Sequence, residues 1–211
     1  MKRFLILLFV LLGYTSVGYS QVLKKIYFDA KDQLTNDSTQ AVSYAIYGRV
    51  SGDEKYVVKK FDADGYLMLT GAFMDDSLKI ADGKFVFYDW VSDVNTLDGT
   101  IPVQQGKERF VTITGNYVKG LKQGTWVSFY PDGKAKNVVN FKDDLFDGEF
   151  KSFSGKGVLT DSGLYSKGKK NGPWLRSGGK QVDTYENDKL ISTVKKSRKE
   201  LKAEELKAGK G

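Results

Sequence analysis

Residues 115–133 read GNYVKGLKQGTWVSFYPDG, and their pattern returns in residues 140–155 (NFKDDLFDGEFKSFSG) and in residues 163–174 (GLYSKGKKNGPW). Three kinds of residue recur at a fixed interval: an aromatic residue, then a glycine, then a second aromatic residue. They are Tyr117, Phe141 and Tyr165, then Gly124, Gly148 and Gly172, then Trp126, Phe150 and Trp174. A fixed interval of this length indicates a repeat architecture, in which each unit buries its apolar face against its neighbours.

One repeat has the composition of a β-hairpin. Residues 124–130 are rich in aromatic and β-branched side chains, which favour strands. The turn formers Pro131, Asp132 and Gly133 follow, and residues 136–141 read as a second strand. Since a lone hairpin is marginally stable, neighbouring hairpins must supply a shared face on which the large rings pack in a row. The sequence therefore predicts an all-β fold, an extended antiparallel meander sheet of tandem hairpins, with the repeated glycines at turns or bulges that need positive φ.

The repeat array is predicted to span residues 42–194, with its best copies at 115–186. Residues 21–41 read as a lead-in strand and loop, and the strand is expected at 24–28. Residues 89–106 hold several Asp, Asn, Gly and Pro residues, and we expect an insertion loop between two hairpins there.

The N-terminal residues 1–20 have the pattern of a cleaved secretory signal, in which Lys2 and Arg3 precede an unbroken apolar run. That apolar segment is too short for a spanning helix, although an uncleaved anchor or a buried N-terminal segment is the alternative. The chain has no cysteine, so neither a lipid-bearing cysteine nor a disulfide is expected. The sequence therefore predicts an exported protein, periplasmic or extracellular.

The C-terminal residues 195–211 form a basic tail, with seven Lys or Arg against three Glu. They are good helix formers with a weak apolar stripe, so a frayed helix or a disordered tail is expected. Most of the net charge of +7 belongs to this tail and to the two basic residues near the N-terminus. The repeat body is close to neutral, and a basic binding face on the sheet is not predicted.

The unit G-x-Y/F, then G-x-W/F, then an aromatic residue and a D/N-G turn resembles the MORN-repeat variants of the YwqK-type antitoxin-like family. Residues 57–190 carry the resemblance, which is clear at 115–133 and weaker at 139–155, where Val139 stands in the place of Gly115. It implies a sheet of β-hairpin repeats, and it associates such repeats with protein contacts and with acidic phospholipids. An antitoxin role conflicts with export, because an exported chain would not meet a cytoplasmic toxin.

The residue types argue against an enzyme. The chain has neither histidine nor cysteine, which excludes Ser-His-Asp and Cys-His catalysis as well as zinc sites built on those ligands. Its acidic pairs are interpreted as solvated turn residues, with a glycosidase-like dyad or a calcium site as the alternatives. These pairs are Asp75-Asp76 and Asp143-Asp144. No catalytic residue, cofactor or metal site is predicted.

The first hypothesis is therefore a non-enzymatic scaffold that binds a protein or a cell-envelope component. One face of the sheet is expected to hold the aromatic rows, and the other to present Lys119, Lys122, Lys167 and Lys169. A second hypothesis is glycan binding by exposed rings, with Trp90 and Tyr130 as the stacking residues. A third is contact with an acidic membrane surface through the repeats or the basic tail. A nucleic-acid partner is not expected.

Overall fold

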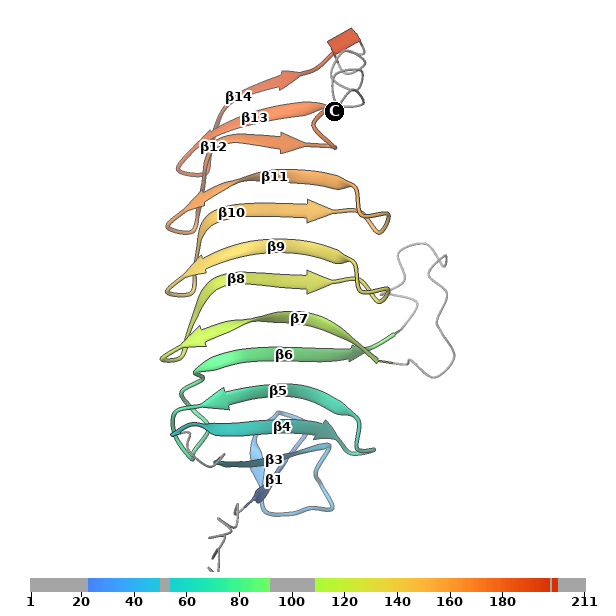
Figure 1. The fold of residues 1–211 in the computed structure, drawn as a ribbon, viewed down its shortest axis with the longest axis vertical. Helices are drawn as coiled ribbons and strands as arrows, with labels where there is room; N and C mark the ends of the chain where they lie inside the picture. Colours follow the sequence, from blue (N-terminus) through green and yellow to red (C-terminus); the bar gives the residue numbers. More distant parts are fainter. Residues whose placement is uncertain (1–22, 50–53, 92–108, 198, 201–211) are drawn as a thin grey trace, which may run out of the picture.

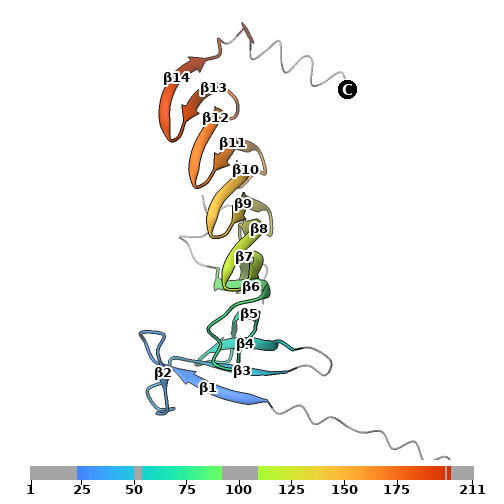
Figure 2. The same cartoon turned by 90° about the vertical axis from the view of Figure 1, so that its left-hand side faces the viewer.

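The computed structural model describes residues 23–49, 54–91, 109–197 and 199–200, and these form one open antiparallel sheet of 14 strands (Figure 1). The predicted all-β meander is confirmed. Figure 2 shows the sheet from its side as a single curved layer, and no helix or second sheet covers either face within the described residues. In this part of the chain no helix reaches the length and apolarity needed to cross a membrane.

The strands follow one another along the sheet. Their bounds are β1 (Lys24–Phe28), β2 (Leu34–Thr35), β3 (Ser43–Arg49), β4 (Tyr56–Asp62), β5 (Leu67–Phe73), β6 (Gly83–Trp90), β7 (Arg109–Val118), β8 (Leu121–Phe129), β9 (Ala135–Lys142), β10 (Leu145–Phe153), β11 (Leu159–Ser166), β12 (Lys169–Arg176), β13 (Gln181–Glu186) and β14 (Lys189–Lys195). From β3 to β14 each strand pairs with its neighbours in the sequence, whereas β1 pairs with β3 and the short β2 forms the outer edge.

Several predicted segments lie outside the described residues. These are the secretory signal at 1–20, residues 92–106 of the insertion loop, and the basic tail from residue 201 onward. The lead-in strand at 24–28 is confirmed as β1. The start of the tail is described, and there Ser197 and Glu200 exchange hydrogen bonds in the manner of a helix cap.

The repeated glycines lie at β-bulges. Gly124, Gly148 and Gly172 have φ angles of 66°, 109° and 73°, and the pairing of β8, β10 and β12 with the preceding strand shifts register around them. An L-residue with a side chain is strained at such angles, and a bulge bends its strand and increases the local twist. The predicted need for positive φ at these three positions is confirmed.

Two-residue turns, here called edge turns, join consecutive strands along one side of the sheet, and they connect each hairpin to the one before it. Both residues of each turn have positive φ, as type I′ hairpins require. The amide N–H of the second turn residue donates to a carbonyl of the preceding hairpin at 2.7–3.2 Å. The donor–acceptor pairs are Gly120–Ala81, Asp144–Lys122, Gly168–Phe146 and Asp188–Lys170. These turns therefore form a hydrogen-bonded column that is separate from the strand ladder.

The two buried tryptophans lie directly on glycines of the neighbouring strand. A Cβ atom added to Gly115 would come within 2.1 Å of the Trp126 ring, and one added to Gly163 within 2.3 Å of Trp174. Each indole N–H donates to the carbonyl of the residue after that glycine, at 3.2 Å for Trp126 and 3.1 Å for Trp174. Tryptophan fits these two positions because the facing residue has no side chain.

The middle repeat uses a smaller ring. Val139 occupies the position equivalent to Gly115 and Gly163, and the ring on the following strand is Phe150 instead of a tryptophan. The weaker sequence match at 139–155 therefore reflects a paired change. Valine replaces the glycine, and the smaller ring of phenylalanine replaces the tryptophan that would pack on it.

This pairing leads to a first prediction. Gly163→Ala forces the Trp174 ring to move, so the free energy of unfolding should fall by about 1–3 kcal/mol, the usual cost of overpacking. In a Trp174→Phe background the same substitution should cost less than half as much, as the natural Val139–Phe150 pair suggests. Urea unfolding of the four proteins in this double-mutant cycle measures both values. Equal costs in the two backgrounds would show that the ring is not the obstacle.

Candidate functional site: the aromatic face and its groove

One face of the sheet carries an unbroken row of aromatic rings that extends from β5 to β13. Neighbouring ring centroids are 4.8–6.2 Å apart, and most pairs meet edge to face or tilted, the arrangements that aromatic quadrupoles favour. In order, the rings are Phe73, Phe85, Tyr117, Trp126, Phe141, Phe146, Tyr165, Trp174 and Tyr185. Phe150 flanks the row, at 5.4 Å from Trp174. We call this surface the aromatic face. All six rings predicted from the repeat lie on it.

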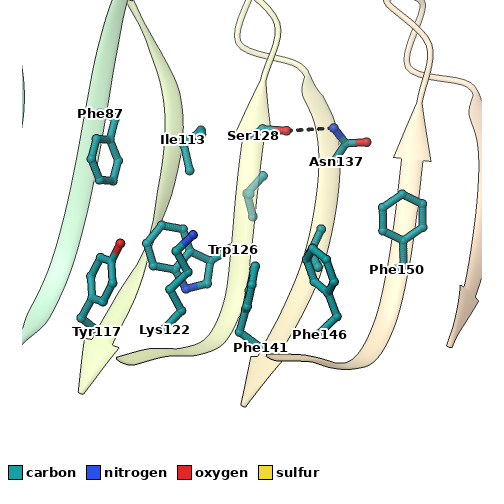
Figure 3. A pocket seen from close by; sticks show the side chains of 12 residues that line it. Phe87, Ile113, Tyr117, Lys122, Trp126, Ser128, Asn137, Phe141, Phe146 and Phe150 are labelled. Atoms are coloured by element: carbon teal, nitrogen blue, oxygen red, sulfur yellow. Dashed lines mark hydrogen bonds between the residues drawn. The ribbon is translucent and has the colours of Figure 1, made fainter. Parts of the chain in front are cut away.

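The aromatic face is hollowed between β6 and β10 into a groove of about 480 Å³ (Figure 3). Trp126 is only 5% exposed and lies in its floor, whereas Ile113 and Phe146 are 40% and 38% exposed. The polar part of the lining includes Ser128 and Asn137, which are joined by a hydrogen bond of 3.2 Å. The groove is thus mainly apolar, and most of its accessible surface comes from aliphatic and aromatic groups.

Lys122 lies on the aromatic face, which corrects the prediction that it lies on the opposite face. Its Nζ is 5.0 Å from the ring centroid of Trp126 and 5.1 Å from that of Phe141. Residues an even number of positions apart in a strand share a face, and the bulge at Gly124 keeps that parity because it adds two residues. Of the other lysines predicted there, Lys119 and Lys167 lie in edge turns.

The two rings predicted to stack on a glycan do not line the groove. Tyr130 is 6% exposed, and its hydroxyl donates to the carbonyl of Phe153 at 2.7 Å, so it is not the exposed ring that was predicted. Trp90 ends β6 with the Arg109 guanidinium 4.8 Å above its ring and Tyr66 against its edge. Both rings take part in packing between neighbouring hairpins.

The acidic pairs are engaged locally and belong to different turns. Asp75 accepts hydrogen bonds from the Ser77 hydroxyl and from the Ile80 N–H, the latter at 2.8 Å. Asp144 accepts from the N–H of Lys122 at 2.7 Å, and Asp143 from the side chain of Gln123. Across the described ranges, no group of three or more potential ligands gathers where it could hold a metal ion.

The Asp75 turn gives a second prediction. The hydrogen bond from Ser77, followed by that from Ile80, lowers the pKa of Asp75 from 3.8 to about 2. A lowered pKa contributes stability that is complete above about pH 4 and is lost as the pH falls through about 2. Asp75→Asn should therefore lower the thermal midpoint at pH 7, and the deficit should shrink toward pH 2.

The matched control is the neighbouring Asp76, whose side chain is 63% exposed and lies 3.8 Å from the ammonium group of Lys24. Asp76→Asn should leave the thermal midpoint nearly unchanged at both pH values, because an exposed ion pair contributes little. A deficit for Asp75→Asn that is the same at pH 7 and pH 2 would contradict the assigned role of its carboxylate.

The fold and the site together define a class: a single-layer sheet of β-hairpin repeats, with one aromatic face that nothing among the described residues covers. Comparison of the chain with protein-family models, with curated proteins and with solved structures finds no match. The resemblance to MORN-repeat variants therefore stays a prediction, and the site has to be interpreted from its own geometry.

Sequence reasoning missed Phe146 and the stacked lysines. The repeat interval does connect them, because positions 122, 146 and 170 are equivalent and hold Lys, Phe and Lys. The series gives no signal in the sequence because it does not repeat a residue type. Its members share a place on the aromatic face.

Proposed function

We propose that the chain is an exported, non-enzymatic scaffold that binds another protein through the groove on its aromatic face. The observation that carries the proposal is the apolar surface of a one-layer sheet that no other part of the described chain covers, with Ile113 and Phe146 about 40% exposed in the groove. Removing such surface from water contributes roughly 25 cal/mol per Å² before the entropic cost of association is subtracted, and the fully buried part of an interface is typically apolar. Export is supported by the residue pattern at 1–20.

A protein partner explains the groove better than a glycan does. Sugars stack on open faces of large rings, but Trp126, Trp174 and Tyr130 are at most 6% exposed. The accessible lining consists instead of groups that complement apolar side chains. A cell-envelope surface is the remaining alternative, since an apolar face with lysines on it also suits an acidic membrane.

The third prediction tests the groove directly. Affinity capture from a cell-envelope extract should recover a protein in stoichiometric amount with the wild-type chain, and the double variant Ile113→Asp/Phe146→Asp should lose it. Charges in the centre of an apolar interface would be desolvated without a partner, so a loss of tenfold or more is expected, which is about 1.4 kcal/mol.

The matched control is Leu164→Asp. Leu164 is 49% exposed and adjoins Gly163, so it points away from the aromatic face. This variant should retain the partner, and circular dichroism should show that all three proteins keep their strand content. Equal capture by both variants, or no stoichiometric partner for the wild type, would contradict the proposal.

A further inference from the structure

Two lysines occupy equivalent places on the aromatic face. Lys122 and Lys170 are separated by two full repeats, and each precedes a buried tryptophan by the same number of positions. The Nζ of Lys170 is 4.6 Å from the ring centroid of Trp174 and 5.1 Å from that of Tyr185, nearly the geometry of Lys122 over its own two rings. The same arrangement therefore occurs twice in the fold: a lysine ammonium group that makes cation–π contacts with two neighbouring rings.

Neither ammonium group has a carboxylate within 4 Å among the described residues, whereas Lys55, Lys60, Lys134 and Lys151 each form an ion pair. Other carboxylates lie nearby: Asp144 and Asp188 accept the backbone N–H groups of Lys122 and Lys170 at 2.7 Å. Hydrogen bonds from Thr193 and Gln181, and to a smaller extent the charge of Lys170, lower the pKa of Asp183, which pairs with Trp174.

Stacking on rings stabilises such a cation without neutralising it. A partner that covers the aromatic face would thus bury two ammonium groups that no carboxylate of the described residues contacts directly, which is costly unless the partner brings anions to them.

An apolar residue stands between the two cations. Phe146, which is 38% exposed, occupies the equivalent place in the middle repeat, one repeat away from each lysine. The three positions lie on β8, β10 and β12, two strands apart in each step. With strands about 4.8 Å apart, the two ammonium groups are separated by about 19 Å. The aromatic face thus presents a fixed pattern of cation, ring and cation.

We propose that the partner is an acidic protein segment that places an apolar side chain at Phe146 and a carboxylate at each of Lys122 and Lys170. This inference rests on the proposed function and adds the chemistry of the partner. Matched charges across an interface set its register, and removing one partner of a buried pair costs affinity, so two carboxylates at this separation would select one alignment of the segment. A membrane surface offers no such fixed spacing.

The test uses synthetic peptides with two glutamates flanking a phenylalanine that is kept on the same face of the peptide as both of them, with the separation of the glutamates varied in steps. Binding to the full chain is measured by fluorescence anisotropy. Affinity should peak at the separation that spans about 19 Å with all three side chains on one face, which is about six residues for an extended peptide and about fourteen for a helical one. Peptides with glutamine in place of both glutamates should bind at least tenfold more weakly.

The protein variants have a matched control in the same repeats. Lys122→Gln/Lys170→Gln should lose at least tenfold in affinity for the best peptide. Lys119→Gln/Lys167→Gln removes two exposed turn lysines that are also two repeats apart, and it should change affinity less than twofold. Equal losses for the two double variants, no optimum in separation, or no binding by any peptide would overturn the inference.

Two further outcomes separate this inference from the proposed function. If Ile113→Asp/Phe146→Asp abolishes capture of the natural partner but Lys122→Gln/Lys170→Gln does not, the inference fails and the groove remains the binding site. The second outcome comes from measuring the binding of both lysine double variants to vesicles of anionic lipid. Vesicle binding that falls equally for both lysine double variants, together with an absence of peptide binding, would replace the acidic segment with a membrane surface.

Discussion

Contact between large rings and bare glycine backbone holds this molecule together. A single-layer sheet has no opposing layer to fill a core, so each aromatic side chain must be buried by its own neighbours. Trp126 and Trp174 reach 5% and 2% exposure because they lie flat over Gly115 and Gly163 and donate their indole N–H groups to the same strand. An indole is one of the largest apolar surfaces that one residue can bury, which suits a fold with so little interior.

The glycine contact also explains why the hairpins bend where they do. The bulges at Gly124 and Gly172 bring each tryptophan over the preceding strand, and the edge turns then fasten successive hairpins through main-chain hydrogen bonds. Ring packing and turn pairing act at different points of the same hairpin. Ring packing and turn hydrogen bonds together fix the register of each hairpin more firmly than the strand hydrogen bonds would alone, because a shift in register would disrupt both kinds of contact.

The sequence was sufficient for the architecture because the regular interval between repeats marks equivalent positions directly. It predicted β1, the hairpins, the bulge glycines and the aromatic row. It failed where a side chain's environment depends on a neighbouring hairpin. Tyr130 was expected to be open, but its hydroxyl bonds to Phe153 of the next hairpin. Lys122 was assigned to the wrong face, although strand parity places it with Trp126. The groove required Phe146, whose equivalents in the repeat are lysines.

The edge turns have a consequence for how the length of this protein can change during evolution. Between Phe73 and Phe85 the chain carries three more residues than between Tyr117 and Trp126, yet the two ring pairs remain at 5.3 and 5.0 Å. The three extra residues lie in the connection between β5 and β6, where the Asp75 carboxylate accepts hydrogen bonds from the N–H groups of Lys79 and Ile80. Insertions in these connections therefore leave the sheet intact. Duplication of a whole hairpin would lengthen the sheet with little effect on the other units, since within the described residues each strand makes most of its contacts with the strands beside it.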